Sequence, residues 1–487
     1  MLDTIDTAHR AEDEEQTREP GFAELDRIFE AQRNAFRNSP IMTAGQRVNH
    51  LNKLREALVR YQDDIIHAIN SDFGCRGADE TRLAEIFPAV EGIRYAARRV
   101  GRWMKPSRRG VSLAFMPGRA RVHYQPMGVV GIIVPWNYPV YLAAGPLTAA
   151  LAAGNRAMIK MSEFTPRTSK VVREMIAQTF REDHVAVITG GADVAAAFSA
   201  KPWDHLLFTG ATAIGRHVMR AASEHLTPVT LELGGKSPAI IGPDTPPKEA
   251  AERIAFGKTF NAGQTCVAPD YVLCPRPLVQ SFASAMESCV SAMFPEMKAN
   301  PHYTAIINDR QYQRIQSLLD DARRQGARII EINPGRENFT GSRKMPLHLL
   351  LDVTGEMTVM KEEIFGPLLP VIPYDTLDEA IAFVNSRPRP LALYYFGYDR
   401  QRIDFVLERT HSGGALVNDT LLHVPIDDLP FGGVGDSGMG RYHGREGFIN
   451  FSNTRGVFYK PRFNSSKMIY PPYGRWIHRL IFKLFIR

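Results

Sequence analysis

Cysteine is scarce in this chain of 487 residues, which contains only Cys75, Cys266, Cys274 and Cys289. None of them forms a C-x-x-C pair, and no histidine lies at metal-ligand spacing from two of them. So few thiols exclude a disulfide-stapled scaffold and give no indication of a metal site. They favour a reducing compartment, and we expect a cytoplasmic protein.

Long apolar runs and long runs of one charge are also missing. No stretch reaches the roughly 18 consecutive apolar residues that a membrane-spanning helix needs. Residues 1–20 are polar and acidic and lack the apolar core of a signal peptide, so we expect a mobile tail there. The 59 basic and 52 acidic residues are spread along the chain, which argues against a nucleic-acid partner and favours a mixed surface.

Alternating strands and helices account for most of the chain. Residues 21–103 place apolar side chains at helical spacing, and Thr43 is positioned to cap one of these helices. Residues 129–134 form an apolar, mostly β-branched run, typical of a buried parallel strand, and strand–helix pairs follow. A second α/β region extends to about residue 427. The pattern predicts an α/β fold with a Rossmann-type parallel sheet that binds its ligand at the strands' carboxyl ends.

Three further segments lie outside this alternation. Arg119–Pro126 has the pattern of an exposed strand, which we expect to pair with a strand near the C-terminus and with another subunit. The glycine-rich segment 430–447 is expected not to form a helix. Residues 476–487 predict a basic amphipathic helix with two alternatives: contact with a membrane surface, or packing on the body or on a partner subunit.

The stretch 229–266 holds the candidate chemistry. Glu232 lies inside a short apolar strand, where an unpaired carboxylate is costly, and Cys266 follows a turn that we expect to be small and polar. Each residue alone has a structural explanation, as a solvated edge glutamate or an inert buried cysteine. Together they predict a nucleophilic thiol with a general base nearby in space.

Two glycines, Gly210 and Gly215, lie where a predicted strand enters a helix. They do not form a G-x-G-x-x-G fingerprint, and glycines at such turns are often purely structural. The helix N-terminus behind them is nevertheless suited to receive a phosphate group.

Four motifs, in this order, resemble those of the NAD(P)-dependent aldehyde dehydrogenases: PWNYP at 135–139, LELGGK at 231–236, GQTC at 263–266 and EEIFGP at 362–367. The resemblance covers about residues 22–460. The residues VAPDY after Cys266 look like the class 3 branch and, within it, the chain is most similar to bacterial coniferyl aldehyde dehydrogenases. The resemblance implies an aldehyde dehydrogenase-like fold with a Rossmann-type cofactor domain, a second α/β catalytic domain and a small β oligomerisation extension.

The implied fold divides the chain into two domains, a dinucleotide-binding domain at 21–108 and 128–235 and a catalytic domain at 236–427. Bridging or oligomerisation segments lie at 109–127 and 428–465. A tail precedes the first domain at 1–20, and a basic amphipathic tail follows at 466–487.

The resemblance also implies a reaction. Cys266 would attack the aldehyde carbon as a thiolate, and the amide of Asn137 with the backbone N–H of Cys266 would hold the resulting oxyanion. Glu232 would activate the water that releases the acid from a thioester. Burial between Leu231 and Leu233 is expected to raise the pKa of Glu232, which suits a base.

A nicotinamide cofactor is implied by the same resemblance. Lys160 and Glu163 match the pair that binds the adenosine ribose, and the family usually has proline where Met161 stands. The carboxylate of Glu163 favours NAD over NADP, and the resemblance allows either cofactor.

The resemblance also assigns cofactor contacts to residues at further matching positions. Gly210 and Gly215 match the phosphate-side turn, Glu363 matches the nicotinamide-ribose contact, and Phe365 and Trp136 match the cofactor side of the site.

Three functions are open to such a chain. One is oxidation of coniferyl-type aromatic aldehydes, and another is oxidation of medium- or long-chain fatty aldehydes with the C-terminal helix at a membrane. A non-catalytic binding or structural protein is disfavoured because Cys266, Glu232 and Asn137 are all present. The class 3 branch implies a homodimer.

Overall fold

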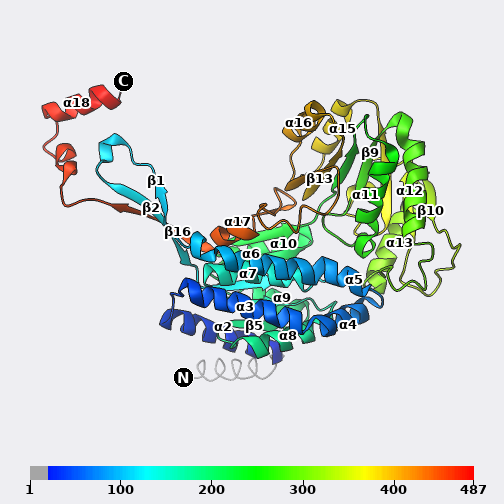
Figure 1. Ribbon diagram of the computed structural model, residues 1–487, viewed down its shortest axis with the longest axis horizontal. Coiled ribbons are helices and arrows are strands. Elements are labelled where there is room, and N and C mark those ends of the chain that lie inside the picture. The colour runs from blue at the N-terminus through cyan, green and yellow to red at the C-terminus, as the bar shows by residue number, and fades with distance from the viewer. Residues whose placement is uncertain (1–19, 487) are drawn as a thin grey trace, which may run out of the picture.

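The computed structural model describes residues 20–486, so the predicted N-terminal tail lies outside the described residues except for Pro20. Three sheets organise this part of the chain, with six, seven and three strands. The two larger sheets form two bodies with their helices, and the three-stranded sheet is an arm that projects from them (Figure 1). The predicted α/β class is confirmed.

The six-stranded sheet has the order β15–β7–β6–β3–β4–β5, with strands β3 (Val129–Ile133), β4 (Arg156–Lys160), β5 (Val185–Ile188), β6 (His205–Gly210), β7 (Val229–Leu233) and β15 (Gly438–Met439). Neighbours are parallel except β15, which is antiparallel to β7. In β3, Val129 and Ile133 enter one hydrophobic cluster, and Val130 and Ile132 enter another. Burial on both faces explains the uninterrupted apolar run in the sequence.

Helices cover both faces of this sheet. One face carries α2 (Pro20–Asn38), α9 (Ala192–Ser199) and α10 (Thr212–Ser223). The other carries a thicker layer: α3 (Ala44–Arg60), α4 (Gln62–Phe73), α5 (Ala78–Thr81), the π-helical turn η1 (Arg82–Ile86), α6 (Phe87–Trp103), α7 (Tyr141–Ala153) and α8 (Pro166–Thr179). Thr43 caps α3 as predicted, because its hydroxyl accepts the N–H of Gln46 at 3.3 Å.

The seven-stranded sheet has the order β10–β11–β12–β9–β8–β13–β14, with strands β8 (Pro238–Ile241), β9 (Tyr271–Pro275), β10 (Arg328–Ile332), β11 (Leu347–Leu351), β12 (Leu368–Tyr374), β13 (Ala392–Phe396) and β14 (Gly414–Val417). Its helical elements are α11 (Pro247–Thr259), η4 (Arg276–Leu278) and α12 (Val279–Met293) with one hydrophobic cluster, and α13 (Asp309–Arg324), α14 (Thr358–Lys361), α15 (Leu377–Asn385) and α16 (Arg400–Arg409) with another, while η3 (Phe260–Gly263) contacts both. The domain boundaries drawn from the sequence stay a prediction.

The arm consists of β1 (Ser107–Arg109), β2 (Arg119–Pro126) and β16 (Ser452–Tyr459), with the short helix η2 (Leu113–Phe115) at its tip. β2 lies between the other two strands and is antiparallel to both, so the predicted exposed strand and its C-terminal partner are confirmed. The chain ends in η5 (Ser465–Ile469) and α18 (Trp476–Phe485). None of the helices within residues 20–486 has the length and apolar character needed to cross a bilayer.

The glycine-rich segment 430–447 corrects one prediction. Its end does form a helix, α17 (Gly444–Asn450), which packs on α6 and α7. Gly444 begins the helix at φ 48°, and a Cβ on Gly447 would lie 3.1 Å from the Cβ of Ala149. The glycines are therefore used for close helix packing, not to prevent a helix.

Candidate active site

Cys266 lies just beyond a strained turn after α11. Asn261 and Ala262 both adopt positive φ, at 51° and 53°, a region that residues other than glycine rarely occupy. The fully buried Gln264 holds this turn: its amide donates to the carbonyls of Asn261 at 2.9 Å and Ala305 at 3.1 Å. Strain persists only where surrounding contacts impose it, so the position of the thiol is set by the fold.

Glu232 is buried in β7, with 3% of its surface exposed. It pairs in register with Thr209 of β6 and Gly438 of β15, and neither carboxyl oxygen has a hydrogen-bond partner within residues 20–486. Burial raises its pKa well above the usual value, and the positive charge of Arg441 opposes this only in part. An unpaired buried carboxyl group is costly to keep, which indicates a functional role.

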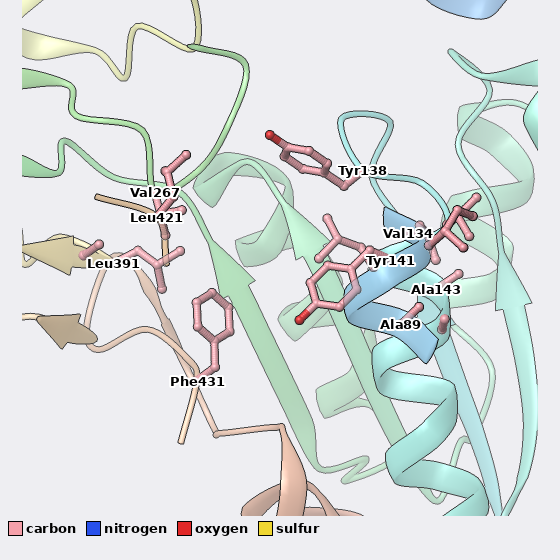
Figure 2. Close-up of a cluster of buried hydrophobic side chains, with 14 of the residues drawn as sticks. Ala89, Val134, Tyr138, Tyr141, Ala143, Val267, Leu391, Leu421 and Phe431 are labelled. Carbon is pink, nitrogen blue, oxygen red and sulfur yellow. The ribbon is translucent and has the colours of Figure 1, made fainter. Parts of the chain in front are cut away.

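Cys266 and Glu232 line one pocket of about 320 Å³. Figure 2 shows Val267, Leu421 and Phe431 on one side of this space, facing Tyr138 and Tyr141 on the other. The sequence-based expectation of a small polar environment for the thiol is therefore wrong, because the residues that surround it come from distant, apolar segments. Burial raises the pKa of Cys266 to about 12, and the charges of Glu363 and Glu232 add to this effect.

Asn137 lies in the loop between β3 and α7 and is buried, with 3% of its surface exposed. Its Nδ2 donates to the backbone carbonyl of Gln264 at 3.2 Å, which attaches its amide to the turn that carries Cys266. An amide nitrogen carries two hydrogens, so one donor remains for another acceptor. Asn137 is thus attached to the turn that carries Cys266, and Cys266 and Glu232 line the same pocket.

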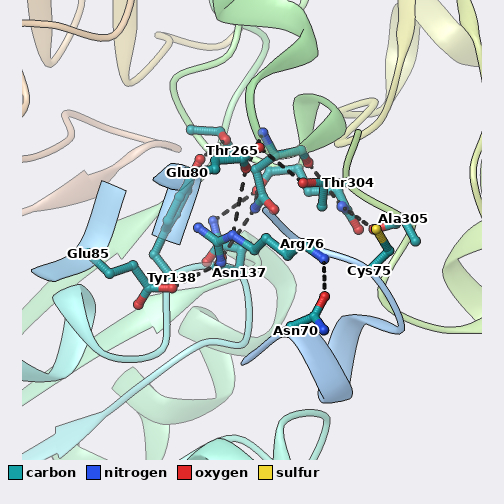
Figure 3. Close-up of polar contacts among 12 residues, drawn as sticks. Asn70, Cys75, Arg76, Glu80, Glu85, Asn137, Tyr138, Thr265, Thr304 and Ala305 are labelled. Atoms are coloured by element: carbon teal, nitrogen blue, oxygen red, sulfur yellow. Dashed lines mark hydrogen bonds and ion pairs between the residues drawn. The ribbon is translucent and has the colours of Figure 1, made fainter. Parts of the chain in front are cut away.

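A buried ionic network supports this arrangement from behind (Figure 3). The fully buried Arg76 pairs with Glu85 at 2.9 Å and donates to the carbonyl of Asn137 at 3.0 Å. Glu85 in turn accepts the N–H groups of Val140 at 2.7 Å and Tyr141 at 3.1 Å. One ion pair therefore holds both ends of the Asn137 loop. The sequence does not reveal this ion pair, because a single arginine in a loop gives no distinguishing pattern.

Glu80 extends the network to the cysteine turn. It accepts the N–H of Asn261 at 2.8 Å and the hydroxyl of Thr304 at 3.0 Å. Burial raises the pKa of Glu80, and the nearby Arg76 opposes that shift.

Replacing Arg76 by methionine is expected to lower the free energy of unfolding by about 3–5 kcal/mol, since it leaves Glu85 buried without its counter-charge. Urea denaturation measures this change. The matched control is Arg82→Met, whose ion pairs with Asp63 and Asp79 are exposed and are expected to contribute less than about 1 kcal/mol. Equal effects of the two substitutions would contradict the role given to Arg76.

Lys160 and Glu163, the residues carried over for the adenosine ribose, lie at the carboxyl end of β4 in the six-stranded sheet. Lys160, the last residue of β4, is buried, and its ammonium lies 4.0 Å from the half-exposed carboxylate of Glu163. Glu163 lines an open groove of about 620 Å³ with Lys170, Arg173 and Glu174. Met161, where the family usually has proline, is buried in the core and donates its N–H to the Ile188 carbonyl at 3.1 Å.

Gly210 ends β6, and Gly215 lies in the first turn of α10. A Cβ on Gly210 would lie 2.6 Å from the ring of Phe208, and one on Gly215 would lie 2.7 Å from Leu233. Both glycines therefore have a packing role, and they leave the N-terminus of a 12-residue helix close to the strand ends.

Glu363, Phe365 and Trp136 lie together beside the cysteine turn. The rings of Trp136 and Phe365 meet edge to face at 5.3 Å between centroids. Burial and the charge of Asp270 raise the pKa of Glu363 to about 8. Arg314 fixes this segment by donating to the carbonyls of Glu363 at 3.2 Å and Ile364 at 2.5 Å, a contact that the sequence did not reveal.

Comparison with known proteins identifies the family of this chain. The model of the aldehyde dehydrogenase family matches residues 4–457, and the chain belongs to that family.

Three individual proteins are similar to this chain over most of its length. A probable coniferyl aldehyde dehydrogenase of Pseudomonas aeruginosa is 59% identical over 95% of this chain and 97% of its own. The substrate-bound structure of Staphylococcus aureus AldH is 37% identical, covers 95% of this chain and 99% of its own, and superposes with a TM-score of 0.89. A Mycobacterium tuberculosis aldehyde dehydrogenase complexed with NAD⁺ is 29% identical over 91% of this chain and 92% of its own, with a TM-score of 0.83.

Proposed function

We propose that this chain oxidises an aromatic aldehyde of the coniferyl type to the carboxylic acid, with NAD(P)⁺ as the electron acceptor. The observation that carries the proposal is that Cys266 and Glu232 line one pocket with aromatic walls, among them Tyr138, Tyr141 and Phe431. Flat aromatic walls suit a conjugated ring, and the scarcity of free polar groups suits an uncharged aldehyde. The Pseudomonas aeruginosa relative supports the same substrate class.

In the proposed first step, the sulfur of Cys266 forms a bond to the carbonyl carbon. Because the pKa of the half-buried thiol is raised to about 12, its proton must move to a base as the sulfur attacks. Water that enters the pocket accepts that proton, so Glu232 stays unprotonated for the hydrolysis that follows. The carbonyl oxygen becomes an oxyanion, for which the free hydrogen of the Asn137 amide and the Cys266 N–H are the donors.

The second half of the reaction releases the acid. A bound NAD(P)⁺ would supply the acceptor for the hydride that leaves the substrate carbon, and the acyl group would stay on Cys266 as a thioester. Glu232 then takes a proton from water, the water oxygen bonds to the acyl carbon, and the C–S bond breaks. Since neither oxygen of Glu232 is bonded within the described residues, the carboxylate is free to orient that water.

The surroundings of Glu363 fit a dinucleotide. Glu363 Oε1 is buried without a hydrogen-bond partner among residues 20–486, and a ribose hydroxyl would satisfy it. A Cβ on Gly234 would lie 2.0 Å from the Glu363 carboxylate, so only glycine leaves room for that side chain. In this proposal Lys160 and Glu163 hold the adenosine ribose, Gly210 and Gly215 border the pyrophosphate, and Phe365 and Trp136 lie at the nicotinamide end.

Glu163 is proposed to select NAD over NADP by repelling the 2′-phosphate. Replacing it by glutamine is expected to raise kcat/KM for NADP relative to NAD by about tenfold, since like charges lose their repulsion. Initial rates with each cofactor measure the ratio. The control is Glu174→Gln, which removes a carboxylate from the same groove at a different place. An unchanged ratio in Glu163→Gln would remove this residue from cofactor selection.

The substrate class is tested by a kinetic panel of aromatic and aliphatic aldehydes. We expect coniferaldehyde to have a higher kcat/KM than decanal. A preference of about a hundredfold for decanal, equivalent to about 2.7 kcal/mol in transition-state binding, would overturn the coniferyl assignment. The second candidate, oxidation of medium- or long-chain fatty aldehydes, is favoured by one observation: the chain ends in an exposed apolar helix.

The assembly and location belong to the same proposal. We propose a homodimer formed through the projecting arm, whose strand β16 leaves its outer edge exposed. The four cysteines are free thiols, which supports a reducing, cytoplasmic setting. Packing of α18 on the body of its own chain, one of the alternatives drawn from the sequence, is wrong because the apolar face of α18 is exposed. We propose that α18 makes a peripheral membrane contact instead.

A further inference from the structure

Tyr141 presents to the pocket a hydroxyl group that the proposed chemistry does not use. The residue begins α7, lines the pocket with Cys266 and Glu232, and is 9% exposed. Figure 2 shows its hydroxyl pointing across the pocket toward Phe431, whereas the hydroxyl of Tyr138 points away from Tyr141. A phenylalanine would form the same flat wall, and a buried hydroxyl is costly unless it has a hydrogen-bond partner. The oxygen of Tyr141 therefore needs a function of its own.

The partner of this hydroxyl is a buried histidine that precedes α17. Nε2 of His443 lies 3.5 Å from the Tyr141 oxygen, at the outer limit for a hydrogen bond, and its Nδ1 has no partner among residues 20–486. His443 adopts a φ of 121°, and its ring stacks on Phe431 at 5.2 Å between centroids. Such strain persists only where surrounding contacts impose it, so the fold holds the imidazole against Tyr141 and Phe431.

The hydroxyl of Tyr141 keeps one free hydrogen-bonding position in either tautomer of the histidine. Burial lowers the pKa of His443 to about 4, so at neutral pH the ring is uncharged and carries one N–H. If Nε2 accepts, the Tyr141 oxygen keeps a lone pair for another donor. If the Nε2–H group donates, the Tyr141 O–H is free for another acceptor. A phenol hydroxyl is both donor and acceptor, so it satisfies either arrangement.

The other hydroxyl groups that line the pocket are engaged or lie near Glu232. Those of Tyr138 and Thr265 bond each other at 2.6 Å. Thr209 pairs in register with Glu232, and the charge of Glu232 adds to burial in raising the pKa of Tyr442. The hydroxyls of Thr209 and Tyr442 therefore belong to the catalytic end of the pocket.

The Tyr141 hydroxyl lies toward the side of the pocket that reaches the surface. Burial raises its pKa, and the charge that adds to this effect is that of Asp427. Asp427 belongs to the loop between β14 and β15, which also carries Leu422, a lining residue that is 49% exposed. A substrate that enters past this loop therefore brings its far end close to Tyr141.

We propose that the Tyr141 hydroxyl binds the hydroxyl group on the ring of a phenolic aldehyde, with His443 as its positioning residue. In p-coumaraldehyde and coniferaldehyde this group lies at the end of the molecule opposite the aldehyde. The aldehyde then faces Cys266 and Glu232, and the ring lies between the aromatic walls. The inference rests on the proposed function and narrows its substrate class from aromatic aldehydes to phenolic ones.

Two aldehydes that differ only in the ring hydroxyl test this assignment. The quantity measured is kcat/KM for p-coumaraldehyde divided by kcat/KM for cinnamaldehyde. In Tyr141→Phe this ratio should fall by about 10- to 100-fold, because the phenol of the substrate is left buried without a partner while the aromatic wall stays. The matched control is Tyr138→Phe, which removes a hydroxyl of the same pocket that Thr265 already engages, and the ratio should stay unchanged.

His443→Phe tests the positioning role. The substitution keeps an aromatic ring against Phe431 and removes the nitrogen that holds the Tyr141 hydroxyl. It should lower the same ratio by about three- to tenfold. Added to Tyr141→Phe, it should lower the ratio no further, because it acts through that hydroxyl. Additive effects of the two substitutions would contradict a positioning role for His443.

Binding without chemistry separates this inference from the proposed function. In a Cys266→Ala background, calorimetry should show that Tyr141→Phe weakens the binding of p-coumaraldehyde by at least about tenfold more than that of cinnamaldehyde. An unchanged kinetic ratio in Tyr141→Phe, or an equal fall in Tyr138→Phe, would overturn the inference and leave aromatic aldehyde oxidation standing. If the unmodified chain oxidises neither aldehyde, the proposed function fails, and calorimetry alone decides whether Tyr141 recognises the phenol.

Discussion

Replacing Cys266 by alanine is expected to lower kcat for aldehyde oxidation by at least about 10⁴-fold while NAD⁺ binding is retained. The alanine cannot form a bond to the carbonyl carbon, and no other cysteine lines the pocket that Glu232 shares. Steady-state NADH production measures the loss, and titration calorimetry measures cofactor binding.

The matched control is Cys289→Ala, which removes a thiol on α12, outside that pocket. This variant should oxidise aldehydes at the rate of the unmodified chain. Persistent turnover in Cys266→Ala would rule out Cys266 as the nucleophile, and loss of NAD⁺ binding would show that the substitution disturbs more than the chemistry.

Replacing Glu232 by glutamine is expected to lower steady-state kcat by about 10²–10⁴-fold, the range typical of a lost general base. Thioester hydrolysis should slow more than hydride transfer, so stopped-flow measurement should show a burst of NADH followed by slow turnover. Asp436→Asn is a control, because it removes a carboxylate that pairs with Arg216 at the surface.

The pH dependence gives a second measure of the same residue. Burial raises the pKa of Glu232, so the active, deprotonated form is present above that raised pKa and is lost as pH falls through it. The acidic limb of the kcat profile should therefore lie at higher pH than an ordinary glutamate would give. In Glu232→Gln that limb should disappear. A limb that persists unchanged would assign it to another group.

Local sequence patterns predicted many of the helices and strands. The β-branched run of β3 predicted a strand buried on both faces, and alternation predicted the exposed strand β2. The helix α17 escaped prediction because glycine is intrinsically unfavourable in helices, and tertiary packing on α7 overrides that preference here.

Part of the candidate site could likewise be predicted from local patterns, and part could not. Cys266 and Glu232 were found because their neighbours in sequence form distinctive motifs. The apolar character of the pocket was missed, since its walls come from distant segments such as Phe87, Phe256 and Phe431. The ion pair of Arg76 and Glu85 was missed for a related reason: its function lies in contacts with the Asn137 loop, which only the folded chain brings together.

The central claim is that Asn137, Glu232 and Cys266 act on one carbonyl group held in the pocket that Cys266 and Glu232 line. Mass spectrometry of Glu232→Gln, quenched in acid after mixing with NAD⁺ and coniferaldehyde, tests it most directly. The account predicts the mass of the bound acyl group on the peptide that contains Cys266, and no such mass when NAD⁺ is omitted. An unmodified Cys266 peptide, or an acyl group on the peptide of Cys75, Cys274 or Cys289, would contradict it.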